Sequence, residues 1–93
     1  MEHELTRHYT DAAAATLKRL AKRNPAVAQQ VNGAIKKYTA KPAQLLAEAT
    51  RIVGTDQYRF RAGDWRVVFE FDDNNAPTAI TITAIGHRKD VYR

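Results

Sequence analysis

A two-residue turn, Gly63-Asp64, lies between two runs of aromatic and β-branched residues, and it constrains the fold more than any other feature. Glycine as the first central residue suits the tight turns whose twist matches that of paired strands. The turn therefore predicts a β-hairpin and fixes its register. In that register Phe60 lies opposite Val67, on a side of the hairpin that carries only apolar residues.

The other side of the hairpin carries Arg59, Arg61 and Arg66, and Arg61 lies directly across from Arg66. Like charges at opposed positions destabilise a sheet unless an anion binds beside them. Guanidinium groups bind phosphate oxygens through paired donors. The arrangement predicts a site for a nucleic-acid phosphodiester; the alternative is a solvated sheet face whose charge is balanced by Asp64 and Glu70.

Hydrophobic periodicity predicts the elements before the hairpin. Residues 2–9 alternate as in a first strand. Apolar residues then recur at helical spacing in two segments, one capped by Thr10 or Asp11 and the next opened by Asn24-Pro25 and ended by Pro42. These segments predict a helical hairpin.

Residues 43–57 have no clean period and are interpreted as a connector with at most one helical turn. Three strands are predicted, at residues 57–62, 65–71 and 79–85. The order strand, helix, helix, strand, strand, strand indicates an α+β domain. We expect the helical hairpin to pack on one face of a mainly antiparallel four-stranded sheet.

A chain of 93 residues has room for one core, so we expect a single domain over residues 1–93. The chain has no cysteine, which excludes a disulfide framework and a thiolate metal site. Its start lacks the features of a signal peptide, and no apolar run approaches the ~20 residues that span a bilayer. We therefore expect a cytoplasmic protein that does not act at a membrane. Because His3 and His8 lack metal-ligand spacing, no metal or cofactor is expected.

The formal net charge is +5, and the excess lies in the helical segment between Asp11 and Lys41. This charge indicates a polyanionic partner, and we expect Lys36 and Lys37 to contribute to substrate binding. A solvated basic face is the bland alternative.

The last strand is expected to bring the C-terminal residues to the same arginines. If Phe71 pairs with Ile80, Ile85 lies beside Arg66, and Gly86 then releases the chain near the hairpin turn. One site is then expected to hold the arginines and four further residues: His87, Arg88, Lys89 and Tyr92. Taken singly, the histidine and the tyrosine more often have surface or packing roles.

Three stretches of the sequence resemble the RelE/ParE superfamily of bacterial toxins: residues 58–61, residues 63–69, and residues 85–88 followed by 91–93. The resemblance spans nearly the whole chain and includes the order of the elements. In detail the sequence is most similar to the RelE branch, whose members cleave messenger RNA in the ribosomal A site and are inhibited by a cognate antitoxin.

The resemblance implies the toxin of a type II toxin–antitoxin system that acts as a metal-independent endoribonuclease. In this reaction the RNA 2′-hydroxyl attacks the adjacent phosphate and leaves a cyclic or 3′-phosphate and a free 5′-hydroxyl. The implied partners are a cognate antitoxin, messenger RNA and the ribosome with its 16S rRNA, while operator DNA is contacted only through the antitoxin complex. Matched to the family's motifs, the implied catalytic residues are Arg59, Arg61, Arg66, Arg88 and Tyr92.

One departure from the family leaves the general base open. Relatives often carry lysines after the tyrosine of the second strand, where this chain has Arg59 and Arg61, and arginine does not lose its proton. We hypothesise that His87 takes one proton-transfer role, because imidazole titrates nearest neutrality. Tyr92 then stacks on a base or orients the substrate, and Lys89 is expected to bind substrate.

A second departure is the absence of a C-terminal helix of the kind that some relatives use against their antitoxin. Antitoxin docking is therefore expected on the basic helical hairpin and an apolar sheet edge. Two other functions remain open: a gyrase-directed toxin of the ParE branch without nuclease activity, and a regulatory member without toxicity.

Overall fold

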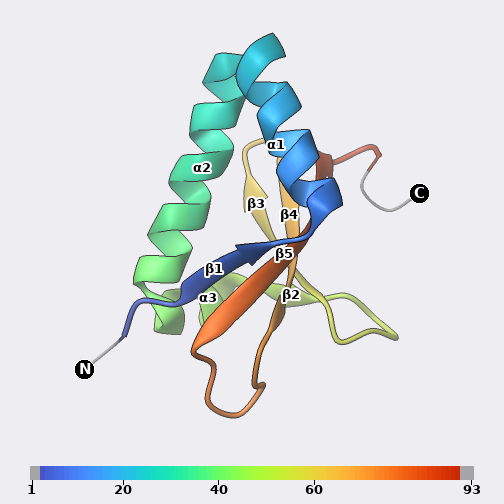
Figure 1. Ribbon diagram of the computed structural model, residues 1–93. Coiled ribbons are helices and arrows are strands. Elements are labelled where there is room, and N and C mark those ends of the chain that lie inside the picture. Colours follow the sequence, from blue (N-terminus) through green and yellow to red (C-terminus); the bar gives the residue numbers. More distant parts are fainter. Residues whose placement is uncertain (1–2, 91–93) are drawn as a thin grey trace.

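The computed structural model describes residues 3–90, which form three helices and a five-stranded sheet (Figure 1). In chain order the elements are β1 (Thr6–Tyr9), α1 (Asp11–Arg23), α2 (Pro25–Ala40), α3 (Pro42–Glu48), β2 (Thr50–Arg51), β3 (Tyr58–Ala62), β4 (Trp65–Phe71) and β5 (Ala79–His87). The strands lie in the order β1-β5-β4-β3-β2. β1 runs parallel to β5, and the other three pairings are antiparallel.

The first two helices begin and end where the sequence predicts. The Thr10 hydroxyl caps α1 by accepting the N–H of Ala13 at 3.2 Å. The Asn24 side chain caps α2 by accepting the N–H of Val27 at 3.4 Å, and Pro25 occupies the first helical position. The two helices form the predicted hairpin and cover one face of the sheet (Figure 1).

The core lies between this hairpin and the sheet. Its largest fully buried side chains come from every layer: Ile35 from α2, Leu45 from α3, Phe69 from β4, and Ile80 and Ile82 from β5. α1 packs against β5 and α2 against β3, and the central strands β4 and β5 carry most of the buried residues of the sheet.

The prediction of a four-stranded sheet is wrong, and the segment 43–57, predicted as a connector with one helical turn at most, contains a longer helix and a short strand. Residues 42–48 form α3, and Thr50–Arg51 pairs with Arg59 and Tyr58 as a fifth strand. Proline is favourable at a first helical position, so Pro42 begins α3 as well as ending α2. Leu45 holds α3 against the core with no exposed surface. The first strand is shorter than predicted, beginning at Thr6.

The pairing of β4 with β5 contains a bulge that the sequence reading did not foresee. Phe69 pairs with Ile82, as assumed, but Val68 pairs with Ala84, so Thr83 is one extra residue in β5. The Thr83 hydroxyl donates to the Val68 carbonyl at 3.3 Å, which ties the extra residue to the neighbouring strand.

As a result, the predicted neighbours Ile85 and Arg66 are not paired. Ile85 lies opposite Val67, and Gly86 lies opposite Arg66. The reason is packing: Ile82 and Ile85 are both buried in the core, yet they are three residues apart. Strict alternation would place them on opposite faces, and the extra residue returns Ile85 to the core face.

Within residues 3–90, none of the helices combines the length and the apolar character needed to cross a membrane. The same part of the chain holds no group of three or more His, Asp or Glu side chains arranged to bind a metal ion.

Candidate functional site

The hairpin that carries the arginines has the predicted turn and register. Gly63 has φ +62°, a conformation that favours glycine, and an added Cβ would meet the side-chain amide of Gln30. Across the two strands Arg61 pairs with Arg66, and Arg59 pairs with Val68. The predicted placement of Arg59, Arg61 and Arg66 on the face away from the core is thus confirmed. These three residues will be called the arginine row.

Arg66 is buried, with only 8% of its surface exposed. Its Nη1 donates to the carbonyls of Gly63 at 3.0 Å and Trp65 at 3.1 Å, so the guanidinium folds back over the turn. Within residues 3–90 no carboxylate lies within ion-pair distance of it, and its Nε and Nη2 have no partner there. The three remaining N–H donors of this side chain reach solvent and are left for an anion.

Arg61 is exposed and lines a hollow of about 290 Å³ at the β3 side of the sheet, whereas Arg66 does not line it. The hollow is formed by residues of α2, α3, β2 and β3, and its lining is Tyr38, Glu48, Thr50, Arg59, Phe60 and Arg61. Two arginines and one carboxylate therefore share one depression, which is the composition of a site for an anion with a proton acceptor beside it.

Glu48 is the residue of this hollow that sequence reasoning missed. Its Oε1 accepts a hydrogen bond from the Tyr38 hydroxyl at 3.4 Å. Burial raises the pKa of Tyr38, and the negative charge of Glu48 raises it further. Because Glu48 ends α3, it stands on an element that was interpreted as a connector. The signal that existed was Pro42 followed by buried Leu45 at helical spacing.

His87 does not join the arginine row. It pairs with Trp65, and their ring centroids are 5.8 Å apart with the planes at 84°. Since neighbouring residues of a strand point to opposite faces, Trp65 and His87 lie on the helix-covered face and Arg66 on the other. Contrary to the expectation of one site that holds His87 with the arginines, the structure places His87 on the opposite face of the sheet from Arg66, because the bulge at Thr83 shifts β5 by one residue.

The residues after β5 remain close to the turn. The backbone N–H of Arg88 donates to the Asp64 carbonyl at 2.8 Å, which holds Arg88 beside the turn that Arg66 caps. The N–H of Lys89 donates to Nδ1 of His87 at 3.3 Å. Arg88 and Lys89 are both exposed. Tyr92, the remaining predicted residue of this group, lies outside the described residues.

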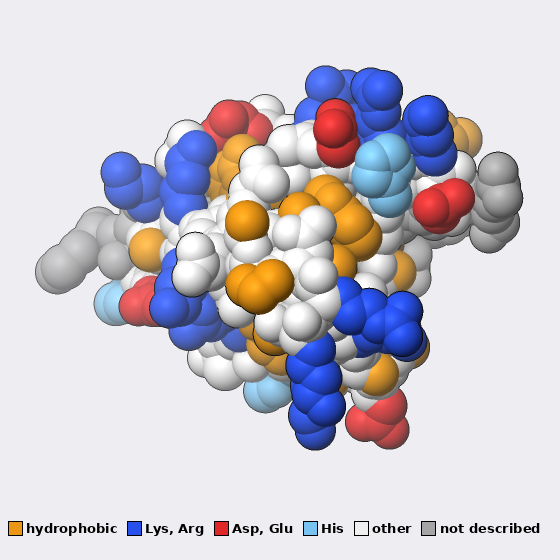
Figure 2. Space-filling view, turned by 90° about the horizontal axis from the view of Figure 1, so that it is seen from above, with side chains coloured by type: hydrophobic (Ala, Val, Ile, Leu, Met, Phe, Trp, Pro, Cys, Tyr) orange, Lys and Arg blue, Asp and Glu red, His pale blue; other side chains and the backbone are white. Residues whose placement is uncertain are grey.

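The two predicted lysines of α2 are exposed, and one of them reaches the hollow's wall. Nζ of Lys37 lies 5.0 Å from the centre of the Tyr38 ring, and Tyr38 lines the hollow. Lys36 has no comparable contact among the described residues. Seen from above, Lys and Arg side chains gather in several groups around the molecule (Figure 2).

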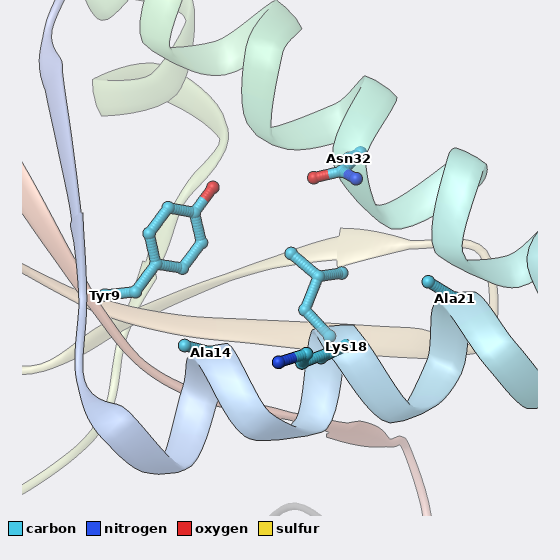
Figure 3. Close-up of a pocket in the computed structure, with 6 residues that line it drawn as sticks. Tyr9, Ala14, Lys18, Ala21 and Asn32 are labelled. Atoms are coloured by element: carbon cyan, nitrogen blue, oxygen red, sulfur yellow. The ribbon is translucent and has the colours of Figure 1, made fainter.

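A separate, apolar groove of about 300 Å³ runs between α1 and α2 (Figure 3). Tyr9 closes one end, Asn32 stands on the α2 side, and Ala14, Lys18 and Ala21 rise from α1. The groove lies on the basic helical hairpin and contains no carboxylate. It is suited to an apolar segment of a partner and not to chemistry.

Comparison with known proteins connects this geometry to a family. A family model described as the ParE toxin of the type II toxin–antitoxin system parDE matches residues 8–92. No curated protein matches the sequence closely enough to count as a relative.

Solved structures share the fold at low sequence identity. A YoeB/ParE toxin from Agrobacterium tumefaciens is 10% identical with a TM-score of 0.72, over 89% of this chain and 98% of its own. The RelBE2 toxin–antitoxin complex from Mycobacterium tuberculosis contains a chain that is 20% identical with a TM-score of 0.71, over 97% of this chain and 98% of its own. In the archaeal RelE–RelB complex from Pyrococcus horikoshii the values are 19% and 0.65, over 96% and 100% of the two chains.

Proposed function

Because the chain belongs to the ParE toxin family and is the toxin of a type II toxin–antitoxin system, we propose that it arrests growth as an endoribonuclease that cleaves messenger RNA. The ribosome, with its 16S rRNA, presents the messenger, and a cognate antitoxin holds the toxin inactive. Operator DNA is reached only through the antitoxin complex.

One observation carries the nuclease proposal: Arg66 is buried with three free N–H donors and stands directly across from Arg61. Within residues 3–90 neither guanidinium has a carboxylate within ion-pair distance. Keeping such a pair costs stability unless an anion is bound. A phosphodiester is the anion that guanidinium groups bind best, and an RNA backbone supplies it.

The chemistry needs these cations and a proton acceptor. The RNA 2′-oxygen forms a bond to phosphorus while the bond from phosphorus to the 5′-oxygen breaks, so negative charge accumulates on the phosphorane oxygens. Arg61 and Arg66 stabilise that charge, with Arg59 and Arg88 flanking them. The proton of the 2′-hydroxyl passes to a base, and the departing 5′-oxygen receives one. Glu48, which shares the hollow with Arg59 and Arg61, is our candidate for the base.

For the antitoxin we propose an acidic amphipathic segment on the helical hairpin. Its apolar side fits the groove between α1 and α2, and its carboxylates meet the lysines and arginines of α1. Two of the matching structures are the RelBE2 toxin–antitoxin complex and the archaeal RelE–RelB complex, which supports a protein partner of this kind.

The test is cleavage of a defined messenger on purified stalled ribosomes, with 5′ ends mapped by primer extension. Wild-type protein should give cuts at the codon in the A site. Arg61→Ala and Arg66→Lys should each slow cleavage by about 100-fold or more. Arg51→Ala, an exposed arginine on β2 outside the hollow, should cleave like wild type. A messenger that stays intact while the protein is toxic in cells would contradict the proposal.

A gyrase-directed toxin of the ParE branch is the second candidate, because the matching family model is described as a ParE toxin. Its signature is loss of supercoiling by purified DNA gyrase with messenger intact. Because this activity does not require a phosphodiester site, Arg66→Lys should leave it unchanged.

A further inference from the structure

On the helix-covered face, a second depression of about 280 Å³ lies between α1 and the turn end of the sheet. Its lining comes from α1, β4, the end of β5 and the segment after it: Thr16, Arg19, Leu20, Arg23, Trp65, Ile85, Gly86, His87 and Asp90. None of the proposed phosphate-binding arginines contributes to it. It will be called the Trp65 groove.

The floor of the Trp65 groove is aromatic. Trp65 is half-buried and meets the edge of His87, with ring centroids 5.8 Å apart. Nδ1 of His87 accepts the backbone N–H of Lys89 at 3.3 Å, and the N–H of Asp90 donates to the His87 carbonyl at 2.8 Å. The first bond fixes the imidazole against which Trp65 packs, and the second fixes the backbone that carries it. A half-buried indole that lines an open groove is a platform on which a nucleobase stacks.

The helix side of the groove is cationic. Arg19 and Arg23 are one helical turn apart on the same face of α1, and both are exposed. Within residues 3–90 the side chain of Arg19 makes one hydrogen bond, to the Thr16 hydroxyl at 3.4 Å, and neither arginine has a carboxylate partner. Two unpaired guanidinium groups therefore stand over an aromatic floor, and Asp90 supplies one acceptor at the rim.

We propose that the Trp65 groove binds one nucleotide of a single-stranded RNA, with the base stacked on Trp65 and its phosphate held by Arg19 and Arg23. The inference rests on the proposed nuclease function, which it extends with a second RNA subsite. Every base can stack on an indole, so this subsite contributes more to the affinity for RNA than to sequence specificity.

The two subsites are neighbours around the turn end of the sheet. Trp65 and Arg66 are consecutive residues on opposite faces of β4, as are His87 and Gly86 on β5. An RNA strand that places one phosphate at Arg61 and Arg66 and then passes the end of the sheet reaches the Trp65 groove with the next part of its chain. The base there is held away from the reacting phosphate, which keeps the strand extended.

Trp65 is the only tryptophan of the chain, so its fluorescence reports on this groove alone. The probe is a short single-stranded RNA with 2′-O-methyl groups, which cannot be cleaved by 2′-hydroxyl attack. We expect saturable quenching in wild type and at least tenfold weaker binding in the double variant Arg19→Ala, Arg23→Ala. The control Lys18→Ala, Lys22→Ala removes the same charge from α1 but does not touch the groove, and its affinity should fall less than threefold.

A second measurement is needed for Trp65 itself, because replacing it removes the fluorescence signal. With Trp65→Phe, binding is followed by the anisotropy of a labelled RNA, and we expect weaker binding at an unchanged melting temperature. Equal losses in the two double variants, or no saturable quenching, would overturn the Trp65 groove. If cleavage on ribosomes is intact in that case, the nuclease function stands without the groove. If quenching is lost only in the Arg19→Ala, Arg23→Ala variant and wild type does not cleave messenger RNA, the Trp65 groove stands as an RNA-binding site and the nuclease proposal is wrong.

Discussion

Arg61 and Arg66 face each other across β3 and β4, and within residues 3–90 neither has a carboxylate within ion-pair distance. Arg66 is nearly buried, and its Nη1 is engaged by two backbone carbonyls. Like charges at opposed positions of a sheet destabilise it, and this pairing is the observation on which the proposed anion site rests.

The first prediction is that removing one of these charges stabilises the empty protein. Arg61→Gln should raise the free energy of unfolding by about 0.2–1 kcal/mol, because it relieves like-charge repulsion. Arg51→Gln is the matched control: Arg51 pairs with Asp56 at 3.3 Å, so its loss should be neutral or slightly destabilising. Thermal melting should also show that inorganic phosphate stabilises wild type more than Arg61→Gln. Equal phosphate effects would argue against an anion site.

The second prediction separates two candidates for proton transfer. Glu48 shares the hollow with Arg59 and Arg61, whereas His87 lies on the other face beside Trp65. Glu48→Gln should slow cleavage on ribosomes by about 10²-fold or more, since general base catalysis contributes 10²–10⁴-fold. His87→Gln should slow it much less. The reverse result would mean that His87 and not Glu48 transfers the proton, and that the scissile phosphate binds near the β3–β4 turn.

Much of the fold follows from local signals. Gly63-Asp64 predicts the β3–β4 hairpin with its register, and Asn24-Pro25 separates the two long helices correctly. The sequence does not predict the short elements. A two-residue strand has no alternation to detect, and α3 is less than two full turns long beyond Pro42.

The candidate site was predictable only in part, for a different reason. The pairing of Arg61 with Arg66 depends on one turn, whose residues are adjacent in sequence. The position of His87 depends on a bulge at Thr83, which arises because Ile85 is needed in the core. That requirement becomes visible only when the whole core is assembled, since no local rule marks the residue at which β5 gains its extra position.

The third prediction concerns this bulge. Deleting Thr83 removes the extra residue, so Ile82, Ala84 and Ile85 alternate strictly and Ile85 stays opposite Val67 in the core. We expect this variant to melt cooperatively, with a melting temperature close to that of wild type. Deleting both Thr83 and Ala84 places Ile85 directly after Ile82 and turns it away from the core, and the lost burial of that side chain is worth about 1.5–3 kcal/mol. That variant should melt well below wild type, whereas deleting Asn74 from the exposed loop between β4 and β5, the control, should shift the melting temperature only slightly. Equal melting temperatures for the single and the double deletion would show that packing of Ile85 does not set the register.

The fourth prediction follows from Asp72, which closes the same loop at the end of β4. Its carboxylate accepts the hydroxyl of Thr78 and the N–H groups of Thr78 and Ala79, at 2.9 and 3.0 Å for the latter two. These hydrogen bonds, that of the Thr78 hydroxyl above all, hold the pKa of Asp72 far below its ordinary value.

A carboxyl whose folded pKa is depressed stabilises the protein fully above its unfolded pKa of about 3.9, and the contribution is lost as pH falls through the folded pKa. Asp72→Asn should therefore melt below wild type at pH 7, and the difference between the two should shrink progressively below about pH 4. Thr78→Val removes the hydrogen bond that lowers the pKa of Asp72 most. On acidification, the melting temperature of that variant should therefore begin to fall at a higher pH than that of wild type. Melting temperatures measured from pH 7 to pH 2 decide it: a difference that stays constant over the whole range would mean that the Asp72 carboxylate does not stabilise the loop through its charge.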